Sequence, residues 1–243
     1  MKKLFKKIPL IRSFVRSTRR FLGIRPEILN IRKQVSLSPE IIKKYFAGTE
    51  IYKLHIGCQD HPLDSWLNAD VYPKHTQIIY LDATMTFPFA DNTFSYIFSE
   101  HMIEHINLLE GLQMIAECYR VLKPGGKIRI ATPDLAFLMN LYAKPEEELH
   151  KSYTTFSKRY FPDNHPVMTG RVVNNFFRDW GHKYIHDKQS LTYLLEHAGF
   201  LEIHFSEVGE SSDPTFKNLE KHGKEITETF NRLETLVAQA LKK

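Results

Sequence analysis

Five short apolar runs alternate with polar turns in the first half of the chain. They cover residues 52–57, 66–71, 78–81, 94–98 and 127–131. Each is bounded by Gly, Pro, Asp or Asn, a pattern typical of strands that are buried on both faces. Between the fourth and fifth runs, residues 108–122 place Leu, Ile and Tyr at helical spacing. This order predicts an α/β fold, a Rossmann-like open and mostly parallel sheet with helices on both faces.

The second half is less regular. Residues 38–46 read as a short helix that Ser38 and Pro39 open, and residues 191–198 as a helix that Gly199 ends. Residues 200–208 read as a strand. Periodicity over 233–241 favours a helix, whereas residues 235–237 are β-prone.

Chemically distinctive residues follow the apolar runs. Gly57, Asp70, Asp82 and Glu100 fall at strand ends, where open α/β sheets bind their ligands. Nine residues separate Gly57 from Leu67 in the next strand, too few for the helix of a parallel crossover, so we expect a turn there. A carboxylate at Asp70 can accept both hydroxyl protons of a ribose, although a turn or helix-capping role explains this residue equally well.

Charge is unevenly distributed. Residues 1–26 hold nine Lys and Arg and no acidic residue, which leaves 24 Lys and Arg against 28 Asp and Glu in the remainder. The slightly acidic body gives no support to nucleic-acid binding. The N-terminal segment reads as a basic amphipathic helix interrupted by Pro9. It is a candidate for peripheral contact with an anionic membrane surface, and the alternative is a helix docked on the domain or a frayed tail.

The segment His101–His105 matches H-x-x-E-H, the signature of a group of zinc proteases, in which both histidines share a helix face with Glu104 beside them. Here the motif directly follows a strand rather than lying inside a long helix, so we expect no metal site. Two cysteines, Cys58 and Cys118, cannot form a disulfide framework, and we expect a cytoplasmic protein, if not one peripheral to the membrane.

Taken together and in order, the motifs resemble those of class I S-adenosylmethionine-dependent methyltransferases. The similarity is closest to a small bacterial branch with E-H-x-x-E-H and R-V-L-K-P-G-G elements, here residues 100–105 and 120–126. In this family the sheet ends with an antiparallel hairpin strand, so we expect a strand within residues 233–241. The resemblance implies that S-adenosylmethionine is the cofactor. By that resemblance the cofactor-binding residues are Gly57, Cys58, Asp70, Asp82, Ala83, Ser99 and Glu100.

Roles within this set also come from the resemblance. Gly57 and Cys58 would present backbone groups to the methionine moiety, Asp70 would hold the ribose, and Asp82 or Ala83 the adenine. Residues 99–101 would form the floor beneath the sulfonium. One position departs from the family pattern, because Gln59 replaces the second glycine of the first motif and its side chain can crowd the methionine end.

Residues 143–186 form a polar, aromatic-rich insertion within a single domain that covers residues 27–243. We expect it to cap the strand ends, with Arg178 and Trp180 lining a pocket suited to a polar ring such as a sugar; a purely structural subdomain is the alternative. For an oxygen acceptor, a general base assists methyl transfer. The candidate bases are His101, His105 and His182.

The sequence therefore predicts methyl transfer to a small molecule, with a saccharide or lipid-linked sugar as the favoured acceptor. A non-catalytic descendant that keeps the fold as a binding or membrane-associated module is the alternative, which Gln59 favours. A nicotinamide-dependent oxidoreductase is disfavoured, since the trimmed first loop offers the pyrophosphate no helix N-terminus.

Overall fold

The structure is a computed structural model that describes residues 26–161, 163 and 165–243. The expectations for the basic N-terminal segment fall outside these residues, apart from its last one, Pro26. Within the described chain, no helix combines the length and apolar character needed to cross a membrane.

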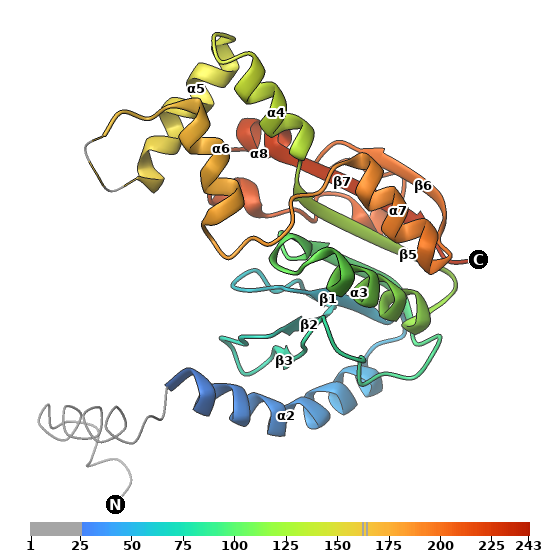
Figure 1. The fold of residues 1–243 in the computed structure, drawn as a ribbon. Helices are drawn as coiled ribbons and strands as arrows, with labels where there is room; N and C mark the ends of the chain where they lie inside the picture. Colours follow the sequence, from blue (N-terminus) through green and yellow to red (C-terminus); the bar gives the residue numbers. More distant parts are fainter. Residues whose placement is uncertain (1–25, 162, 164) are drawn as a thin grey trace, which may run out of the picture.

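Seven strands form one sheet in the order β3-β2-β1-β4-β5-β7-β6 (Figure 1). Strands β1 to β5 pair in parallel, and β7 is antiparallel to both of its neighbours. The predicted fold class and the five predicted strands are confirmed, as is the C-terminal strand. The strands are β1 Lys53–Ile56, β2 Leu67–Asp70, β3 Ile79–Tyr80, β4 Phe94–Glu100, β5 Leu122–Pro133, β6 Leu201–Ser206 and β7 Thr235–Leu241.

Seven α-helices and four 3-10 helices accompany the sheet in the described chain. The α-helices are α2 Pro26–Gly48, α3 Leu108–Val121, α4 Leu135–Ala143, α5 Glu148–Phe156, α6 Thr169–Arg178, α7 Lys188–Ala198 and α8 Glu228–Glu234. The 3-10 helices are η2 Ile103–His105, η3 Ser157–Tyr160, η4 Pro214–Phe216 and η5 His222–Lys224.

The two faces of the sheet are covered differently. Leu54, Ile56 and Ile97 belong to the large core against which residues of α2, α3 and α7 pack. The second face carries a smaller cluster of Trp66, Phe98 and Phe216, the last of which belongs to η4. As predicted, β1 and β2 are joined by turns without a helix. This leaves the second face to the segment between β6 and α8.

Helix α2 is longer than the sequence predicted. The prediction began the helix at Ser38, because proline favours the first turn, whereas the helix runs from Pro26 and contains Pro39 within it. The Ser38 hydroxyl donates to the Gln34 carbonyl at 2.7 Å and accepts from the Tyr80 amide at 2.9 Å. Tertiary contact with β3 thus offsets the helix-breaking tendency of Pro39.

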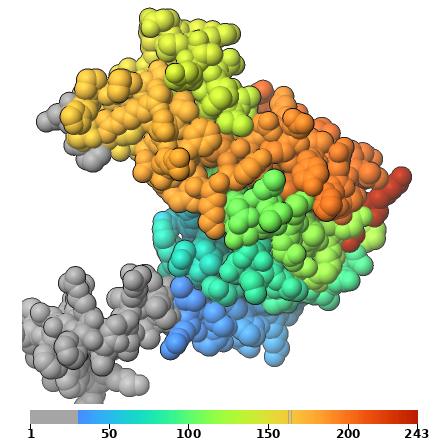
Figure 2. Space-filling model, viewed as in Figure 1, coloured from blue at the N-terminus to red at the C-terminus, as the bar shows by residue number. Residues whose placement is uncertain are grey.

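Helices α4, α5 and α6 form their own small core beyond the carboxyl end of β5, built around Phe137, Leu141, Tyr153 and Phe176. Figure 2 shows this part, in yellow-green to light orange, projecting from the body of the molecule. Two backbone hydrogen bonds connect it to the segment after β4, because the amides of Lys183 and Tyr184 donate to the Glu104 carbonyl at 2.7 and 3.2 Å.

A buried ion pair holds the segment after β6 on the second face. Nε of Arg129, on β5, lies 2.5 Å from Oε1 of Glu220, and both side chains are fully buried. Nη1 of Arg129 also donates to the Glu210 carbonyl at 3.0 Å. The next residues, Lys221 and His222, donate their backbone amides to the Glu100 carboxylate at 2.8–2.9 Å. The side chain of His222 is thereby fixed above the tip of β4.

Candidate functional site

A cavity of about 510 Å³ opens at the carboxyl ends of β1 and β4, a volume typical of small-molecule sites. Its walls combine the turn after β1, the segment after β4, the insertion and the segment leading into α8. The candidate residues that line it are Gly57, Cys58, Glu100, His101, His105, Trp180 and His182. The further lining residues used below are His55, Gln59, Glu104, Tyr153, Tyr160, Phe176, His222, Glu225 and Glu234.

The turn after β1 requires glycine at its first position. Gly57 has φ +74°, and a Cβ there would lie 2.4 Å from Cγ of Met102, so any other residue would be strained and would force Met102 to move. The amides of Gly57 and Cys58 both donate to the Ala69 carbonyl, at 2.9 and 3.1 Å. Burial, with Asp70 nearby, raises the pKa of the Cys58 thiol to about 12, so this cysteine stays protonated and unreactive.

The Asp70 side chain stabilises the same turn through hydrogen bonds. Its side chain is 7% exposed, and its carboxylate accepts from the Gln59 amide at 2.9 Å and from the Tyr72 amide at 2.6 Å. Gln59 itself adopts φ +43°, a left-handed conformation that glycine tolerates better than glutamine. Glycine, which the family pattern has at this position, would adopt this backbone conformation without the strain that Gln59 carries.

Several candidates lie away from the cavity wall. Asp82 closes a turn after β3, where its Oδ1 accepts from the amide and the hydroxyl of Thr84 at 3.0 and 2.7 Å. Ser99 is fully buried in β4, and Arg178 is exposed at the end of α6. None of these three, nor Asp70 or Ala83, is among the residues that line the cavity.

The segment after β4 turns sharply at His101, whose φ is +45°. Nδ1 of His101 lies 3.2 Å from Oε1 of Glu104, which is fully buried. Burial opposes the charged form of each partner, yet their mutual attraction outweighs it, raising the pKa of His101 and lowering that of Glu104. Each partner thus favours the charged form of the other.

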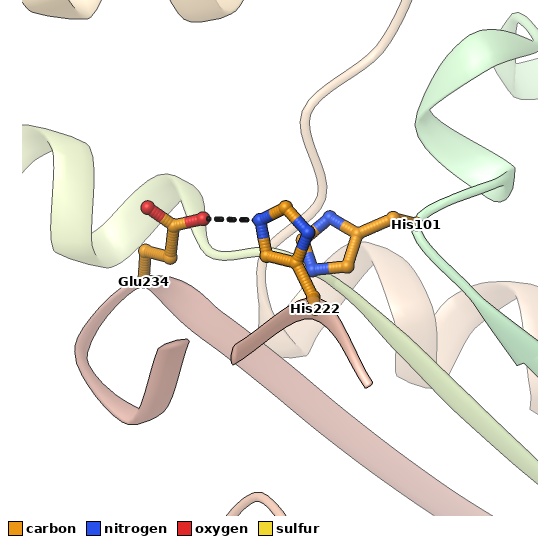
Figure 3. A group of neighbouring side chains, drawn as sticks. All are labelled: His101, His222 and Glu234. Carbon is orange, nitrogen blue, oxygen red and sulfur yellow. Dashed lines mark hydrogen bonds and ion pairs between the residues drawn. The ribbon is translucent and has the colours of Figure 1, made fainter. Parts of the chain in front are cut away.

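A second histidine lies against the first. The rings of His101 and His222 have centroids 3.9 Å apart, and Nε2 of His222 lies 3.2 Å from Oε1 of Glu234. Figure 3 shows the His222 ring between the Glu234 carboxylate and the His101 ring. The hydroxyl of Tyr153 donates to the other oxygen of Glu234. A histidine oriented by a carboxylate is the arrangement of a general base.

Sequence reasoning missed this dyad. His222 and Glu234 lie in polar stretches with no motif around them. The Arg129–Glu220 ion pair and the Glu100 carboxylate hold the segment of His222 at the tip of β4, and Glu234 is placed by α8, which leads into β7.

The H-x-x-E-H segment does not form the helical zinc motif. It contains a 3-10 turn, η2, and its two histidines belong to different clusters, His101 beside His222 and Glu234, and His105 beside Glu104 and His182. Nδ1 of His182 lies 2.8 Å from the Phe176 carbonyl. Burial lowers the pKa of His182, so its imidazole is neutral near pH 7.

The insertion contributes an aromatic wall. The Trp180 ring is 46% exposed and makes edge-to-face contacts with Tyr160 at 5.1 Å and with Phe176 at 5.4 Å between ring centroids. Carboxylates of Glu100, Glu104, Glu225 and Glu234 complement it, and no Lys or Arg of the described residues lines the cavity. Aromatic faces with carboxylate acceptors suit a hydroxyl-rich or amine-bearing ligand better than an anionic one.

Comparison with known proteins matches residues 54–130 to the family model of a methyltransferase domain. This segment runs from β1 into β5. Residues 54–130 are a methyltransferase domain. The resemblance to class I methyltransferases that the motifs predicted is confirmed.

Curated relatives of this methyltransferase domain include a ubiquinone/menaquinone biosynthesis C-methyltransferase from Dinoroseobacter shibae. It is 25% identical over 121 residues, which are 50% of this chain and 44% of the relative. Phosphoethanolamine N-methyltransferase 2 from Caenorhabditis elegans is 32% identical over 94 residues, 37% of this chain and 19% of the relative. This chain thus spans less than half the length of either relative.

Among solved structures, a SAM-dependent methyltransferase from Archaeoglobus fulgidus aligns with a TM-score of 0.46 and 16% identity, over 86% of this chain and 94% of the other.

Proposed function

We propose that this protein transfers a methyl group from S-adenosylmethionine to a small molecule. The observation that carries the proposal is the continuity of one cavity, which joins the Gly57 turn of the methyltransferase domain to a group of histidines and carboxylates. Methyl transfer from a sulfonium is an in-line displacement, so holding donor and acceptor in one enclosed site supplies most of the acceleration, roughly 7–11 kcal/mol.

At the donor end, the backbone of Gly57 and Cys58 lies against the methionine moiety of the cofactor. Asp70 approaches the ribose with the carboxylate lone pairs that the Gln59 and Tyr72 amides leave over. Asp82 and Ala83 flank the adenine, and residues 99–101 form the floor under the sulfonium. These assignments rest on the family resemblance and on the position of the residues at the tips of β1 to β4.

At the acceptor end, the proton of the acceptor leaves to a histidine. His101, His105 and His182 all line the cavity, as the sequence suggested, and His222 joins them. His222 is best oriented for the task, because Glu234 lies at hydrogen-bond distance from its Nε2 and stabilises the imidazolium that forms. Nδ1 of His101 is already paired with Glu104, so the role of His101 is to position His222 and the acceptor.

The acceptor class that fits this end best is a saccharide, free or lipid-linked. Trp180 offers an exposed aromatic face on which a sugar ring can stack, and the glutamates of the wall accept hydroxyl protons. The helices of residues 143–186 act as the cap over this site. An N-terminal basic segment that contacts an anionic membrane would bring the enzyme, otherwise cytoplasmic, to a lipid-linked acceptor.

Calorimetry with S-adenosylhomocysteine and with NADH tests the donor. Binding of S-adenosylhomocysteine alone supports the proposal, and binding of NADH alone contradicts it. Turnover with labelled S-adenosylmethionine against saccharides, phosphorylated amines and quinone precursors then tests the acceptor. Methylation confined to amines or ring carbons would contradict the saccharide assignment. Cofactor binding without turnover of any acceptor favours the non-catalytic alternative.

Vesicle flotation of the full chain, beside a chain lacking residues 1–26, tests the membrane contact. Equal flotation of the two on anionic vesicles contradicts it.

A further inference from the structure

Three metal-ligand side chains converge at the acceptor end. Glu104 and His105 come from η2, and His182 from the turn after α6. One ligand atom of each lies within 4.8 Å of the other two. The backbone bonds from Lys183 and Tyr184 to the Glu104 carbonyl join the two segments. Backbone hydrogen bonds therefore hold together the two segments that carry the three side chains.

Glu104 is the first pointer to a ligand. Its side chain is fully buried, and a buried carboxylate is costly unless it is paired or coordinates a cation. Oε2 accepts from the Thr132 hydroxyl at 3.1 Å. Oε1 has no hydrogen bond, and its 3.2 Å contact with His101 Nδ1 is an ion pair only. One buried oxygen of Glu104 is thus left with coordination capacity.

His182 is the second pointer. Its Nδ1 lies 2.8 Å from the Phe176 carbonyl. A carbonyl only accepts, so Nδ1 carries the proton and Nε2 keeps its lone pair. Ligating histidines are held in this way, by a hydrogen bond from the other ring nitrogen to a carbonyl. Gly181, with φ +81°, turns the chain so that the His182 and His105 rings meet edge to face, 4.9 Å apart.

We propose that Glu104, His105 and His182 bind a divalent transition metal ion of the Zn²⁺ type. Two imidazoles and a carboxylate are a ligand set of catalytic zinc sites, which leave a further position for water or substrate. Imidazole ligands favour zinc over magnesium or calcium, which prefer oxygen. Thr132 and His101 supply the outer contacts that orient Glu104. The inference departs from the expectation of no metal drawn from the sequence.

The neighbouring cluster of His101, His222 and Glu234 is also compact enough for an ion. None of its ligand atoms is among the buried atoms of the described residues that lack a hydrogen bond, whereas Oε1 of Glu104 is. Glu234 is engaged by His222 and Tyr153, and His101 by Glu104 and, at 3.4 Å, by the Thr235 hydroxyl. We therefore assign the cation to Glu104, His105 and His182, and the role of general base to the hydrogen-bonded His222.

In combination with the proposed function, the ion would hold an oxygen of the acceptor. It would lower the pKa of a bound hydroxyl, and the proton would pass to a cavity histidine as the oxygen takes the methyl group. The metal site itself does not depend on that role.

The full chain, stripped with a chelator, is titrated with Zn²⁺ and separately with Mg²⁺ by calorimetry. We expect one Zn²⁺ per chain, no comparable Mg²⁺ binding, and a rise in Tm with Zn²⁺ because the ion binds the folded state. His182→Ala and Glu104→Gln each lower Zn²⁺ affinity by at least about tenfold. The matched control, His75→Ala, removes an exposed histidine and binds as the unchanged chain does.

Co²⁺ added to the unchanged chain provides a readout free of any variant, an intense visible absorption typical of tetrahedral nitrogen and oxygen ligation that Zn²⁺ abolishes. The absence of stoichiometric Zn²⁺ in the unchanged chain overturns the site. So does wild-type affinity in His182→Ala, or loss of the ion in His222→Ala with retention in His182→Ala. S-adenosylhomocysteine binding, measured on the same samples, separates failure of the proposed function from failure of the metal site.

Discussion

The backbone amide of Gln59 donates to Oδ2 of Asp70 across 2.9 Å. This contact ties a left-handed, non-glycine residue to the carboxylate at the end of β2 and so shapes the donor end of the cavity. The side chains at positions 59 and 70 can each be substituted, and each substitution leads to a prediction.

Gln59→Gly should improve the donor site. Relief of the left-handed conformation contributes about 1–2 kcal/mol, and the greater backbone entropy of glycine costs about 0.5–1 kcal/mol. The free energy of unfolding should therefore rise by up to about 1.5 kcal/mol, and calorimetry should show tighter S-adenosylhomocysteine binding. Gln59→Ala keeps the strain but removes most of the side chain, so an equal gain in both variants points to crowding. Unchanged affinity in both contradicts the prediction.

Asp70→Ala should weaken S-adenosylhomocysteine binding at least about tenfold, a loss of ~1.4 kcal/mol, because the turn loses its acceptor for the Gln59 and Tyr72 amides as well as a contact with the ribose. Unfolding should become easier by about 1–3 kcal/mol. Asp64→Ala, at an exposed carboxylate nearby, serves as the control. Wild-type affinity in Asp70→Ala would show that the ribose assignment is wrong.

Acid should destabilise the protein through His55. Burial lowers the pKa of this histidine from 6.5 to about 4, so the unfolded chain binds a proton at a higher pH than the folded chain does. Protonation of His55 costs no stability above pH 6.5. As the pH drops from 6.5 toward 4, it lowers the free energy of unfolding by about 3 kcal/mol in total. Urea midpoints at a series of pH values measure the loss, and His55→Gln should show a flatter profile. Identical slopes in the two proteins contradict the prediction.

The Arg129–Glu220 pair should couple stability to the site. Glu220→Gln leaves a buried guanidinium short of its partner, which costs about 3–5 kcal/mol and releases the segment that carries His222. The urea midpoint of unfolding and the rate of methyl transfer should therefore fall together. Glu210→Gln changes an exposed carboxylate in the same segment and should alter neither. A fully active Glu220→Gln protein would show that the segment needs no anchor.

His222→Gln should reduce kcat by about 10²–10⁴ while leaving S-adenosylhomocysteine affinity unchanged, because a base acts in the transition state rather than in cofactor binding. Glu234→Gln should lower kcat by a smaller factor and shift the pH profile. An unaltered kcat in His222→Gln would show that His222 is not the general base.

The strand pattern was readable from sequence because a parallel sheet buried on both faces imposes continuous apolar runs, such as residues 94–98. Gly57 was readable because a strand-end glycine marks a close backbone approach, here to Met102. The start of α2 was not, because Pro39 carries a local stop signal that packing against β3 overrides. Periodicity misled for residues 235–241, where pairing with β5 and β6 decides the conformation.

Long-range geometry sets the limit at the site. The motif at residues 101–105 identified a reactive segment, but whether its histidines share one cluster depends on the left-handed turn at His101. His222 could not be placed from sequence because its segment is held by a buried ion pair between residues 91 positions apart. Glu234 could not be placed because its position depends on the pairing of β7 with β5.

Strand β7, the last of the seven along the chain, lies inside the sheet between β5 and β6. During synthesis β6 consequently emerges before the strand it needs as a neighbour, and it can join the sheet only when β7 arrives. Since α8 leads directly into β7, the carboxylate of Glu234 reaches the cavity in that same late step. A nascent chain can thus complete the turn after β1 early, but Glu234 reaches its place beside His222 only when the sheet closes.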